Sequence, residues 1–311
     1  MRAGVVIPAH NAASFILDAI FSVRSQTVPD WHVVVVDDGS TDATPSLLAP
    51  LADPRITTVR QPNAGVSAAR NAGVAALPPV DAVLFLDADD RPAPDALDRL
   101  RAGLRGDAGL AYGAFAFVRA LDQRTVRIKR PRLGRDALRA MLDRNHFANG
   151  GHLLIRRDAL NRAGPFRTDL RFGEDYEHWI RLALQGPFAS VPGPPVLFVR
   201  QRDDDAYLRA AHESSAHAGY VDAIFQQTEL AARLGKNLPH ARKRMVAEAA
   251  WIIGRARLAR GDASGLHDLA SSVAAKPSAR RAALLAALFV LSRRRRVRVP
   301  RPAPSRIPPA R

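Results

Sequence analysis

Cysteine is absent from the 311-residue chain. This absence excludes a disulfide framework, a thiolate metal site and catalysis by a cysteine nucleophile. Long apolar runs are missing as well. The longest run in the C-terminal part, residues 282–291, has about half of the roughly 20 residues that a helix needs to span a bilayer. Near the N-terminus the apolar run 5–7 ends at Pro8, so no secretory signal is predicted.

Several catalytic sequence patterns are also missing. The chain has no GxxxxGK[ST], no GxGxxG, no GxSxG and no HExxH. These absences remove the sequence signals of P-loop nucleotide sites, Rossmann dinucleotide sites, hydrolases with a nucleophile elbow, and zinc proteases. His146 and His152 could be metal ligands, but most such histidines have a structural role.

Acidic residues are absent from the C-terminal end, which makes the charge of the chain uneven. From Lys276 onward there are eleven Lys and Arg residues, which leaves 35 of the 46 basic residues against 30 acidic ones in the rest. The formal charge of +16 therefore belongs mainly to a basic tail and does not make the main part a nucleic-acid binder. The chain is 47% hydrophobic and 24% charged, an ordinary globular composition.

Short apolar runs alternate with amphipathic segments along the first hundred residues. Strands are predicted at 4–7, 32–36, 55–60 and 83–86, and helices at 15–23, 44–51, 66–77 and 94–104. This alternation is typical of an α/β protein with a mostly parallel sheet. Further on, the patterns predict strands at 114–118, 126–128 and 153–155, a helix at 174–185, a proline-rich loop at 187–195, and helices beyond 205.

Polar clusters follow three of the predicted strands. They are residues 8–11 (PAHN), 37–42 (DDGSTD) and 87–90 (DADD). Because the carboxyl ends of parallel strands meet at one edge of a sheet, where the ligand crevice of such folds lies, we expect the clusters to converge there. Taken alone, the second cluster would also suit an ordinary turn and helix cap.

The acidic cluster 87–90 is the sharpest of the three signals. Three carboxylates within four residues repel one another unless a cation lies between them. Mg²⁺ and Mn²⁺ prefer carboxylate oxygens and can bridge to substrate phosphates. The cluster therefore predicts a divalent metal site, with a solvated acidic loop as the alternative.

Three further segments suggest contacts with an anionic substrate or an acceptor. Segment 63–73 leads a loop into a helix, where Gly65 permits close backbone approach and Arg70 could reach a diphosphate. Glu174 and Asp175 begin a later helix, which suits the helix dipole, and a catalytic interpretation makes Asp175 a general base. The Arg and Lys cluster at 124–135 suggests an anionic acceptor or headgroup, or a solvated basic loop.

In order and spacing, these motifs resemble those of the family 2 glycosyltransferases with the GT-A fold. The resemblance rests on residues 5–11, 35–42, 63–73, 86–90, 164–166 (GPF) and 173–181 (GEDYEHWIR). It covers about residues 1–200. It implies a Rossmann-like, mostly parallel α/β sheet flanked by helices. The helical pattern beyond residue 205 adds the expectation of a C-terminal helical extension.

The resemblance also implies roles for site residues. The expected nucleotide-sugar contacts come from Pro8, His10, Asn11, Asp38, Gly65, Arg70, Asp87 and Ala88. Among them, Asp38 is expected to meet the nucleobase. Asp89 is expected to bind Mn²⁺ or Mg²⁺, and Asp175 to be the catalytic base. Many relatives carry a histidine shortly after the last strand of this domain, whereas residues 198–202 (FVRQR) contain none.

The expected reaction is transfer of one sugar from a nucleotide-diphosphate donor to an acceptor hydroxyl. A metal-held leaving group and a carboxylate base on opposite faces predict a single displacement with inversion at the anomeric carbon. No second carboxylate nucleophile is required. The QxxRW signature of processive members is absent, so a non-processive, hexosyltransferase-type enzyme is expected. The donor is expected to be UDP-linked, and the pathway to be cell-surface polysaccharide or glycolipid synthesis.

The expected domains follow from the motifs and the charge. They are a GT-A domain at 1–204 (nucleotide-sugar half 1–110, acceptor and base half 111–204), a helical extension at 205–292, and a basic disordered tail at 293–311. The expected partners are a nucleotide sugar, a glycan or lipid-linked acceptor, and an anionic membrane surface reached through the tail, with no nucleic acid. A cytoplasmic protein, peripheral on the inner face of the membrane, would fit them.

Two other functions suit parts of the sequence. A GT-A-like nucleotidyltransferase would use the same nucleotide motifs, but its chemistry does not need the acidic residues Glu174 and Asp175. A non-catalytic module would use only the basic tail, to bind membrane or nucleic acid.

Overall fold

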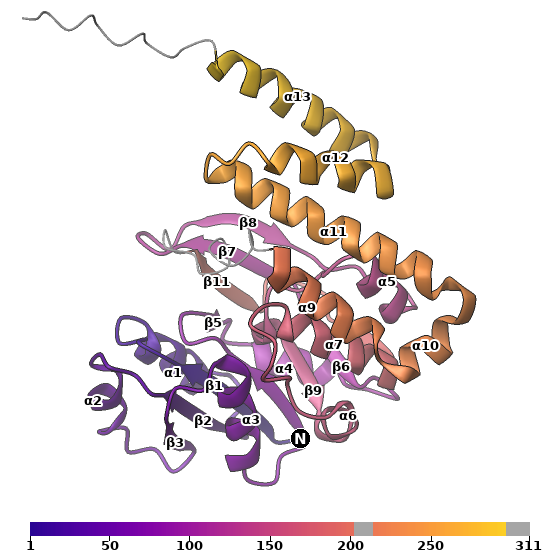
Figure 1. Ribbon diagram of the computed structural model, residues 1–311. Coiled ribbons are helices and arrows are strands. Elements are labelled where there is room, and N and C mark those ends of the chain that lie inside the picture. Colours follow the sequence, from indigo (N-terminus) through magenta and orange to yellow (C-terminus); the bar gives the residue numbers. More distant parts are fainter. Residues whose placement is uncertain (202–213, 297–311) are drawn as a thin grey trace, which may run out of the picture. The chain divides into compact units, whose positions relative to one another are not determined.

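The computed structural model describes residues 1–201 and 214–296 (Figure 1). The chain divides into two compact units, Met1–Met245 and Val246–Arg311. The first unit contains two sheets and the helices around them. The described part of the second unit is helical.

Seven strands form the larger sheet, in the order β10-β6-β9-β4-β1-β2-β3. They are β1 (Ala3–Ala9), β2 (Trp31–Asp38), β3 (Ile56–Gln61), β4 (Ala82–Phe85), β6 (Leu110–Tyr112), β9 (Leu153–Arg156) and β10 (Phe188–Ser190). β4, β1, β2 and β3 are mutually parallel, and β9 runs antiparallel to both of its neighbours. The mostly parallel α/β sheet is confirmed.

Helices cover both faces of the parallel strands. β2 is buried along its whole length, and its side chains alternate between two cores: Val33 and Val35 join one, Val34 and Val36 the other. The helices of this half are α1 (Ile16–Arg24), α2 (Thr44–Leu48), α3 (Val66–Ala76) and α4 (Ala96–Gly103). Burying each such valine side chain contributes about 1.5–3 kcal/mol, which explains why residues 33–36 are all valine.

Close packing of α3 on the sheet depends on a glycine. A Cβ added at Gly73 would lie 2.3 Å from the Cγ1 atom of Val6 in β1. Any side chain there would push the helix away from the strands. The absence of a side chain therefore fixes the approach of α3, the helix that carries Arg70.

A smaller sheet has the strand order β5-β11-β7-β8. Its strands are β5 (Arg91–Pro92), β7 (Phe115–Arg119), β8 (Thr125–Lys129) and β11 (Leu197–Gln201). The predicted strands at 114–118 and 126–128 are confirmed as an antiparallel hairpin. β5 follows the acidic cluster directly, so this sheet begins beside the predicted metal segment.

The remaining helices of the first unit surround the antiparallel part of the larger sheet. They are α5 (Ala137–Asp143), η1 (Gly150–His152), α6 (Arg157–Ala163), α7 (Glu174–Gln185), α9 (Ser214–Phe225), α10 (Thr228–Leu234) and η2 (Gly235–Asn237). The predicted helix 174–185 is confirmed as α7. Its Trp179 and Ile180 are fully buried in a core shared with β4, β6 and β9.

α11 (Leu238–Ala259) contains the boundary between the units, and α12 (Gly265–Ala275) and α13 (Ala279–Arg296) follow it. α11 and α12 approach closely at two glycines, because a Cβ on Gly254 would lie 2.6 Å from the carbonyl oxygen of Gly265. Glu248 accepts from Lys276 at 3.1 Å and from Arg281. These contacts hold the three helical segments together.

Two sequence predictions are wrong in part. β10 lies within the predicted loop 187–195, because pairing with β6 at the sheet edge overrides the flanking prolines. α13 continues to Arg296, so the disordered tail predicted from residue 293 is wrong for 293–296. Residues 297–311 lie outside the described part. The domain boundary at 204 stays a prediction.

Candidate active site

The carboxyl ends of β1, β2 and β4 lie side by side, as the parallel pairing requires. His10 Nδ1 lies 2.8 Å from the carbonyl oxygen of Asp38. Asn11 Oδ1 accepts from the backbone N–H of Thr41 at 2.8 Å, and Asn11 N donates to Ser40 Oγ at 3.0 Å. The clusters 8–11 and 37–42 therefore meet, and Pro8 lies within β1 beside them.

Asp38 is buried and organises the loop that leads into α3. Its carboxylate accepts from the backbone N–H groups of Ala64 and Gly65, both at 2.9 Å, and from Gln61 Nε2 at 2.7 Å. Both of its oxygens therefore bind the chain itself. Contact with a nucleobase stays a prediction for this residue.

Gly65 is the residue before α3 and has a φ of +89°. Residues that carry a Cβ atom rarely adopt this backbone conformation, because it is sterically strained for them. A Cβ there would meet no protein atom within 4 Å, so its glycine character follows from the backbone conformation and not from crowding by the chain. The open space beside Gly65 leaves the N-terminus of α3 accessible to an anion.

Arg70 is buried between two carboxylates from different parts of the chain. Its guanidinium lies 3.2 Å from Asp87 Oδ1 and 3.1 Å from Glu174 Oε1. It also lies over the ring of Phe166, 5.2 Å from the centroid. Arg70 therefore joins the acidic cluster to the N-terminus of α7. Its contact with a diphosphate stays a prediction.

Asn149 completes the site and was missed by the sequence analysis. Its Nδ2 donates to Asp87 Oδ2 at 3.0 Å and to Asp90 Oδ2 at 2.6 Å, while its Oδ1 accepts from Gly151 N at 2.9 Å. Asp90 also accepts from the backbone N–H of Arg200 at 2.9 Å. Asn149 follows no predicted strand, and only its place before two glycines could have drawn attention to it.

The acidic cluster fits a divalent cation in its chemistry. Asp87 and Asp89 offer carboxylate oxygens, the ligands that Mn²⁺ and Mg²⁺ prefer, and Ala88 between them is half-buried. Within residues 1–201 and 214–296, no three His, Cys, Asp or Glu side chains are grouped to hold a metal. If a cation binds here, Asp87 and Asp89 are the side chains that would hold it.

Asp175 lies in the first turn of α7, next to the ion pair of Glu174 with Arg70. Burial, and then the neighbouring charge of Glu174, raise the pKa of Asp175 to about 7, while Arg70 opposes this shift. Its Oδ1 accepts from the backbone N–H of Tyr176 at 2.5 Å. A carboxylate with this pKa can accept a proton near neutral pH.

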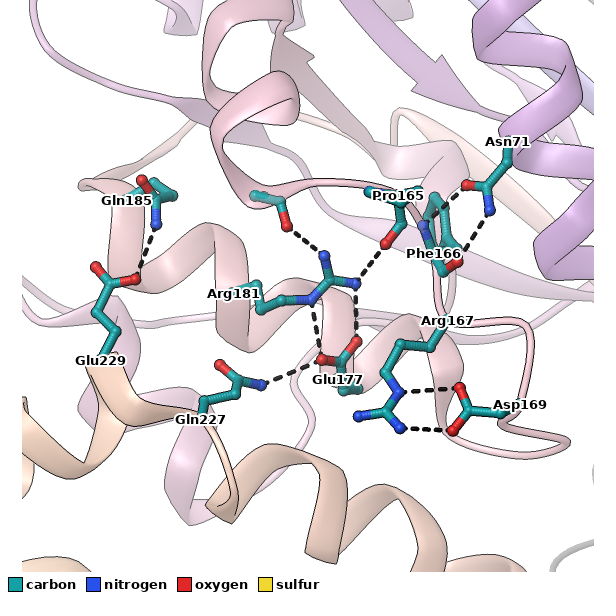
Figure 2. A network of polar contacts seen from close by, with 11 residues as sticks. Asn71, Pro165, Phe166, Arg167, Asp169, Glu177, Arg181, Gln185, Gln227 and Glu229 are labelled. Carbon is teal, nitrogen blue, oxygen red and sulfur yellow. Dashed lines mark hydrogen bonds and ion pairs between the residues drawn. The ribbon is translucent and has the colours of Figure 1, made fainter.

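A polar network holds the middle of α7 against residues 163–166 (Figure 2). Arg181 makes two hydrogen bonds of 2.9 Å with Glu177 and donates to the carbonyl oxygens of Ala163 and Pro165. Asn71 of α3 pairs with both backbone groups of Phe166, at 2.8 and 2.9 Å. This network fixes Phe166, whose ring lies beside Arg70, relative to α3 and α7.

The buried histidines between residues 111 and 201, His152 and His178, have structural roles. His152 Nδ1 donates to the carbonyl oxygen of Gly113 at 3.1 Å, and Ala148 N donates to His152 Nε2 at 3.3 Å. Burial lowers the pKa of His152 to about 3. His178 stacks on Phe166 with centroids 4.0 Å apart. Both nitrogens of His152 are used, so it is not a metal ligand here.

The stretch without histidine that was compared with the relatives, residues 198–202, lies almost entirely within a strand. Residues 197–201 are strand β11 itself. The segment that follows, 202–213, contains His212 and lies outside the described residues.

The fold is that of the GT-A glycosyltransferases among the solved structures that it resembles. The family model described as "Glycosyl transferase family 2" matches residues 4–164. The succinoglycan biosynthesis protein ExoO of Rhizobium meliloti is 33% identical over 260 residues, which cover 78% of this chain and 73% of that protein. The chain therefore belongs to glycosyl transferase family 2.

Other similar proteins extend this picture. The chondroitin synthase of Escherichia coli is 28% identical over 193 residues, 60% of this chain and 27% of that protein. S. aureus TarS 1-349 in complex with UDP-GlcNAc shares the fold, with a TM-score of 0.58 at 15% identity over 88% of this chain and 89% of that one. The mannosyltransferase PcManGT from Pyrobaculum calidifontis, in complex with GDP-Man and Mn²⁺, has a TM-score of 0.54 at 25% identity over 94% and 80%.

Proposed function

We propose that this chain is an inverting, non-processive hexosyltransferase that moves one sugar from a nucleotide diphosphate to an acceptor hydroxyl. The observation that carries the proposal is the position of Arg70, in contact with Asp87 on one side and Glu174 on the other. One buried guanidinium thereby links the acidic cluster to the helix that bears Asp175. Charge neutralisation and proton acceptance are both required for sugar transfer.

The proposed chemistry assigns one step to each group. Asp175 takes the proton from the acceptor hydroxyl as its oxygen attacks the anomeric carbon, and the bond to the diphosphate breaks on the opposite face. A divalent cation bound at Asp89 would neutralise charge on the departing diphosphate. Asp87 keeps its orientation through Arg70 and Asn149. Inversion follows from a single displacement.

The donor is proposed to lie over the carboxyl ends of β1, β2 and β4. Pro8, His10, Asn11, Asp38, Gly65, Arg70, Asp87 and Ala88 are proposed to contact it, and UDP is the proposed nucleotide. Support comes from TarS, whose complex contains UDP-GlcNAc. The complex of PcManGT with GDP-Man and Mn²⁺ supports the proposed use of a divalent metal, and it makes GDP the alternative nucleotide. The pathway proposed is cell-surface polysaccharide or glycolipid synthesis, as the name of ExoO suggests.

A peripheral place on the inner face of the cell membrane is also proposed, with a glycan or lipid-linked acceptor. None of the helices within 1–201 and 214–296 is long and apolar enough to cross a bilayer. α13 instead exposes Leu284 and Phe289 after Arg280 and Arg281. Sedimentation with anionic vesicles should fall when the arginines after residue 292 are replaced by glutamine. Unchanged sedimentation would contradict the membrane role of the tail.

The reaction is tested by incubating the full chain with UDP-linked and GDP-linked sugars, Mn²⁺ and candidate acceptors, and by identifying the products by mass spectrometry and NMR. The proposal predicts a free nucleoside diphosphate and a glycoside of inverted anomeric configuration. A nucleotidyltransferase would instead form or consume pyrophosphate. A non-catalytic module would turn over no donor and would gain no thermal stability from UDP plus Mn²⁺.

A further inference from the structure

The hairpin β7–β8 presents an unusual surface of the first unit. β8 is the edge strand of the smaller sheet, and all five of its residues are exposed. The strand and the residues around it carry six exposed cations, Arg124, Arg127, Lys129, Arg130, Arg132 and Arg135. The acid at the turn, Asp122, pairs with Arg119 at 2.6 Å. The surface therefore has a strong net positive charge.

Large apolar side chains are interleaved with these cations. Leu121 at the turn of the hairpin is 97% exposed, Val126 is 57% exposed and Ile128 is 42% exposed. Side chains alternate along β8, so Ile128 lies on the opposite face of the strand from Arg127 and Lys129, which both lie over the ring of Phe117. A partner that contacts both faces and the turn must therefore offer both negative charge and an apolar layer.

The hairpin is anchored, which makes its surface a defined one. Arg127 lies over the ring of Phe117 in β7, 4.8 Å from the centroid. Ala120 N donates to the carbonyl oxygen of Gln201 at 3.3 Å. Gln123 at the turn accepts from Arg91 Nη2 at 2.5 Å. Arg91 follows the acidic cluster directly, so the turn is tied to the segment beside the candidate active site.

We propose that the β7–β8 hairpin docks the first unit onto an anionic lipid membrane, with Leu121 entering the interface. Lipid headgroups match the cations, and the boundary of the acyl chains matches Leu121, Val126 and Ile128. An anionic glycan would match only the cations. A second copy of the hairpin would bring like charges together along the exposed strand edge. This docking does not depend on the proposed reaction, and it would bring membrane-bound acceptors close to the acidic cluster.

The absence of native cysteine allows a direct test. Leu121→Cys in the full chain is labelled with an environment-sensitive fluorophore and mixed with vesicles of phosphatidylglycerol and phosphatidylcholine in equal parts. The expected result is a blue-shifted, brighter emission that is absent with pure phosphatidylcholine and reduced by high salt. The matched control is Phe21→Cys, since Phe21 is 47% exposed on α1 and its label should not respond.

Charge variants in the Leu121→Cys background complete the test. Arg124→Glu with Arg130→Glu should abolish the emission change, whereas the exposed pair Arg233→Glu with Lys236→Glu should leave it intact. An unchanged emission while the protein still sediments with vesicles would overturn the proposal. So would an equal change with neutral vesicles, or the same change with a soluble anionic glycan. Thermal stabilisation by UDP plus Mn²⁺, measured on the same variants, reports on the proposed reaction separately.

Discussion

The two halves of the first unit build their polar groups in different ways. In residues 1–110 the polar side chains stand at the ends of buried parallel strands, and partners such as Asp38 and Gly65 lie in consecutive motifs. In residues 111–201 the motif that begins at Glu174 is also contiguous, but its other polar partners, such as Asn149 and Arg200, are isolated in the sequence. The first half therefore carries a pattern that can be recognised in the sequence, and the second half adds single residues to it.

The halves are joined at Asp87. One of its carboxylate oxygens accepts from Arg70 of the first half, and the other accepts from Asn149 of the second. Arg70 continues the connection to Glu174. Variants on either side of Asp87 can therefore show which half contributes metal binding, which contributes proton transfer, and how strongly the two are coupled.

The largest effect is expected for Asp89→Ala, on the first-half side. Metal-dependent sugar transfer should become undetectable while the circular dichroism spectrum stays that of the wild type, because the side chain is half-buried at a strand end. The control is Asp98→Ala, which removes an exposed acid on α4. Transfer by Asp89→Ala at the wild-type rate would remove the metal from the mechanism.

Asp175→Asn should lower the rate by about 10²–10⁴-fold, the usual effect of losing a general base, while nucleotide binding is kept. With the pKa of Asp175 at about 7, the wild-type rate should fall as the pH falls below about 7, because the protonated acid cannot accept a proton. The control is Asp169→Asn, an exposed acid in the preceding loop. Lost nucleotide affinity with an unchanged rate would make Asp175 structural.

The same pKa predicts a dependence of stability on pH. The folded-state pKa of Asp175 lies above the unfolded value of about 3.9, so the folded protein binds more protons between these values. The contribution of this group to the free energy of unfolding should therefore decrease as the pH rises from about 4 to about 7. Asp175→Asn should lack that part of the decrease in denaturant titrations. An identical slope in both proteins would contradict the assigned pKa.

Arg70→Gln tests the coupling itself. Losing this buried cation should lower the free energy of unfolding by about 2–3 kcal/mol. This loss is smaller than the usual loss on breaking a fully buried ion pair, because Asp87 is partly exposed to solvent. It should also raise the pKa of Asp175, which moves the acidic limb of the pH–rate profile to higher pH. The control is Arg162→Gln, from an exposed pair with Asp158, with an expected loss below about 1 kcal/mol. An unchanged pH–rate profile in Arg70→Gln would show that Arg70 does not couple the acidic cluster to Asp175.

Asn149→Ala is expected to give the smallest effect. It removes the donor shared by Asp87 and buried Asp90, which should cost about 1–3 kcal/mol of stability and weaken Mn²⁺ binding in the presence of nucleotide by about 10–100-fold. Electron paramagnetic resonance of Mn²⁺ measures the binding directly. Asn161→Ala changes an exposed asparagine and should alter neither quantity. Unchanged Mn²⁺ affinity in Asn149→Ala would confine Asn149 to a structural role.

The sequence predicted the parts of this picture that depend on local pattern. A run of valines buried on both faces, as in β2, identifies a strand and the edge at which its polar end lies. Asn149 could not be found in this way, because its meaning depends on Asp87, which is 62 residues distant. β10 was also missed, since its pairing with β6, and not its own composition, makes it a strand.

In the proposed mechanism Asp89 binds the metal beside the nucleotide, and Asp175 accepts the proton. Isothermal titration of UDP or GDP into the full chain with Mn²⁺ tests it most directly when wild type, Asp89→Ala and Asp175→Asn are compared. We expect Mn²⁺-dependent nucleotide binding by the wild type and by Asp175→Asn, and loss of that dependence in Asp89→Ala. Mn²⁺-dependent nucleotide binding that survives in Asp89→Ala but disappears in Asp175→Asn would contradict these assignments.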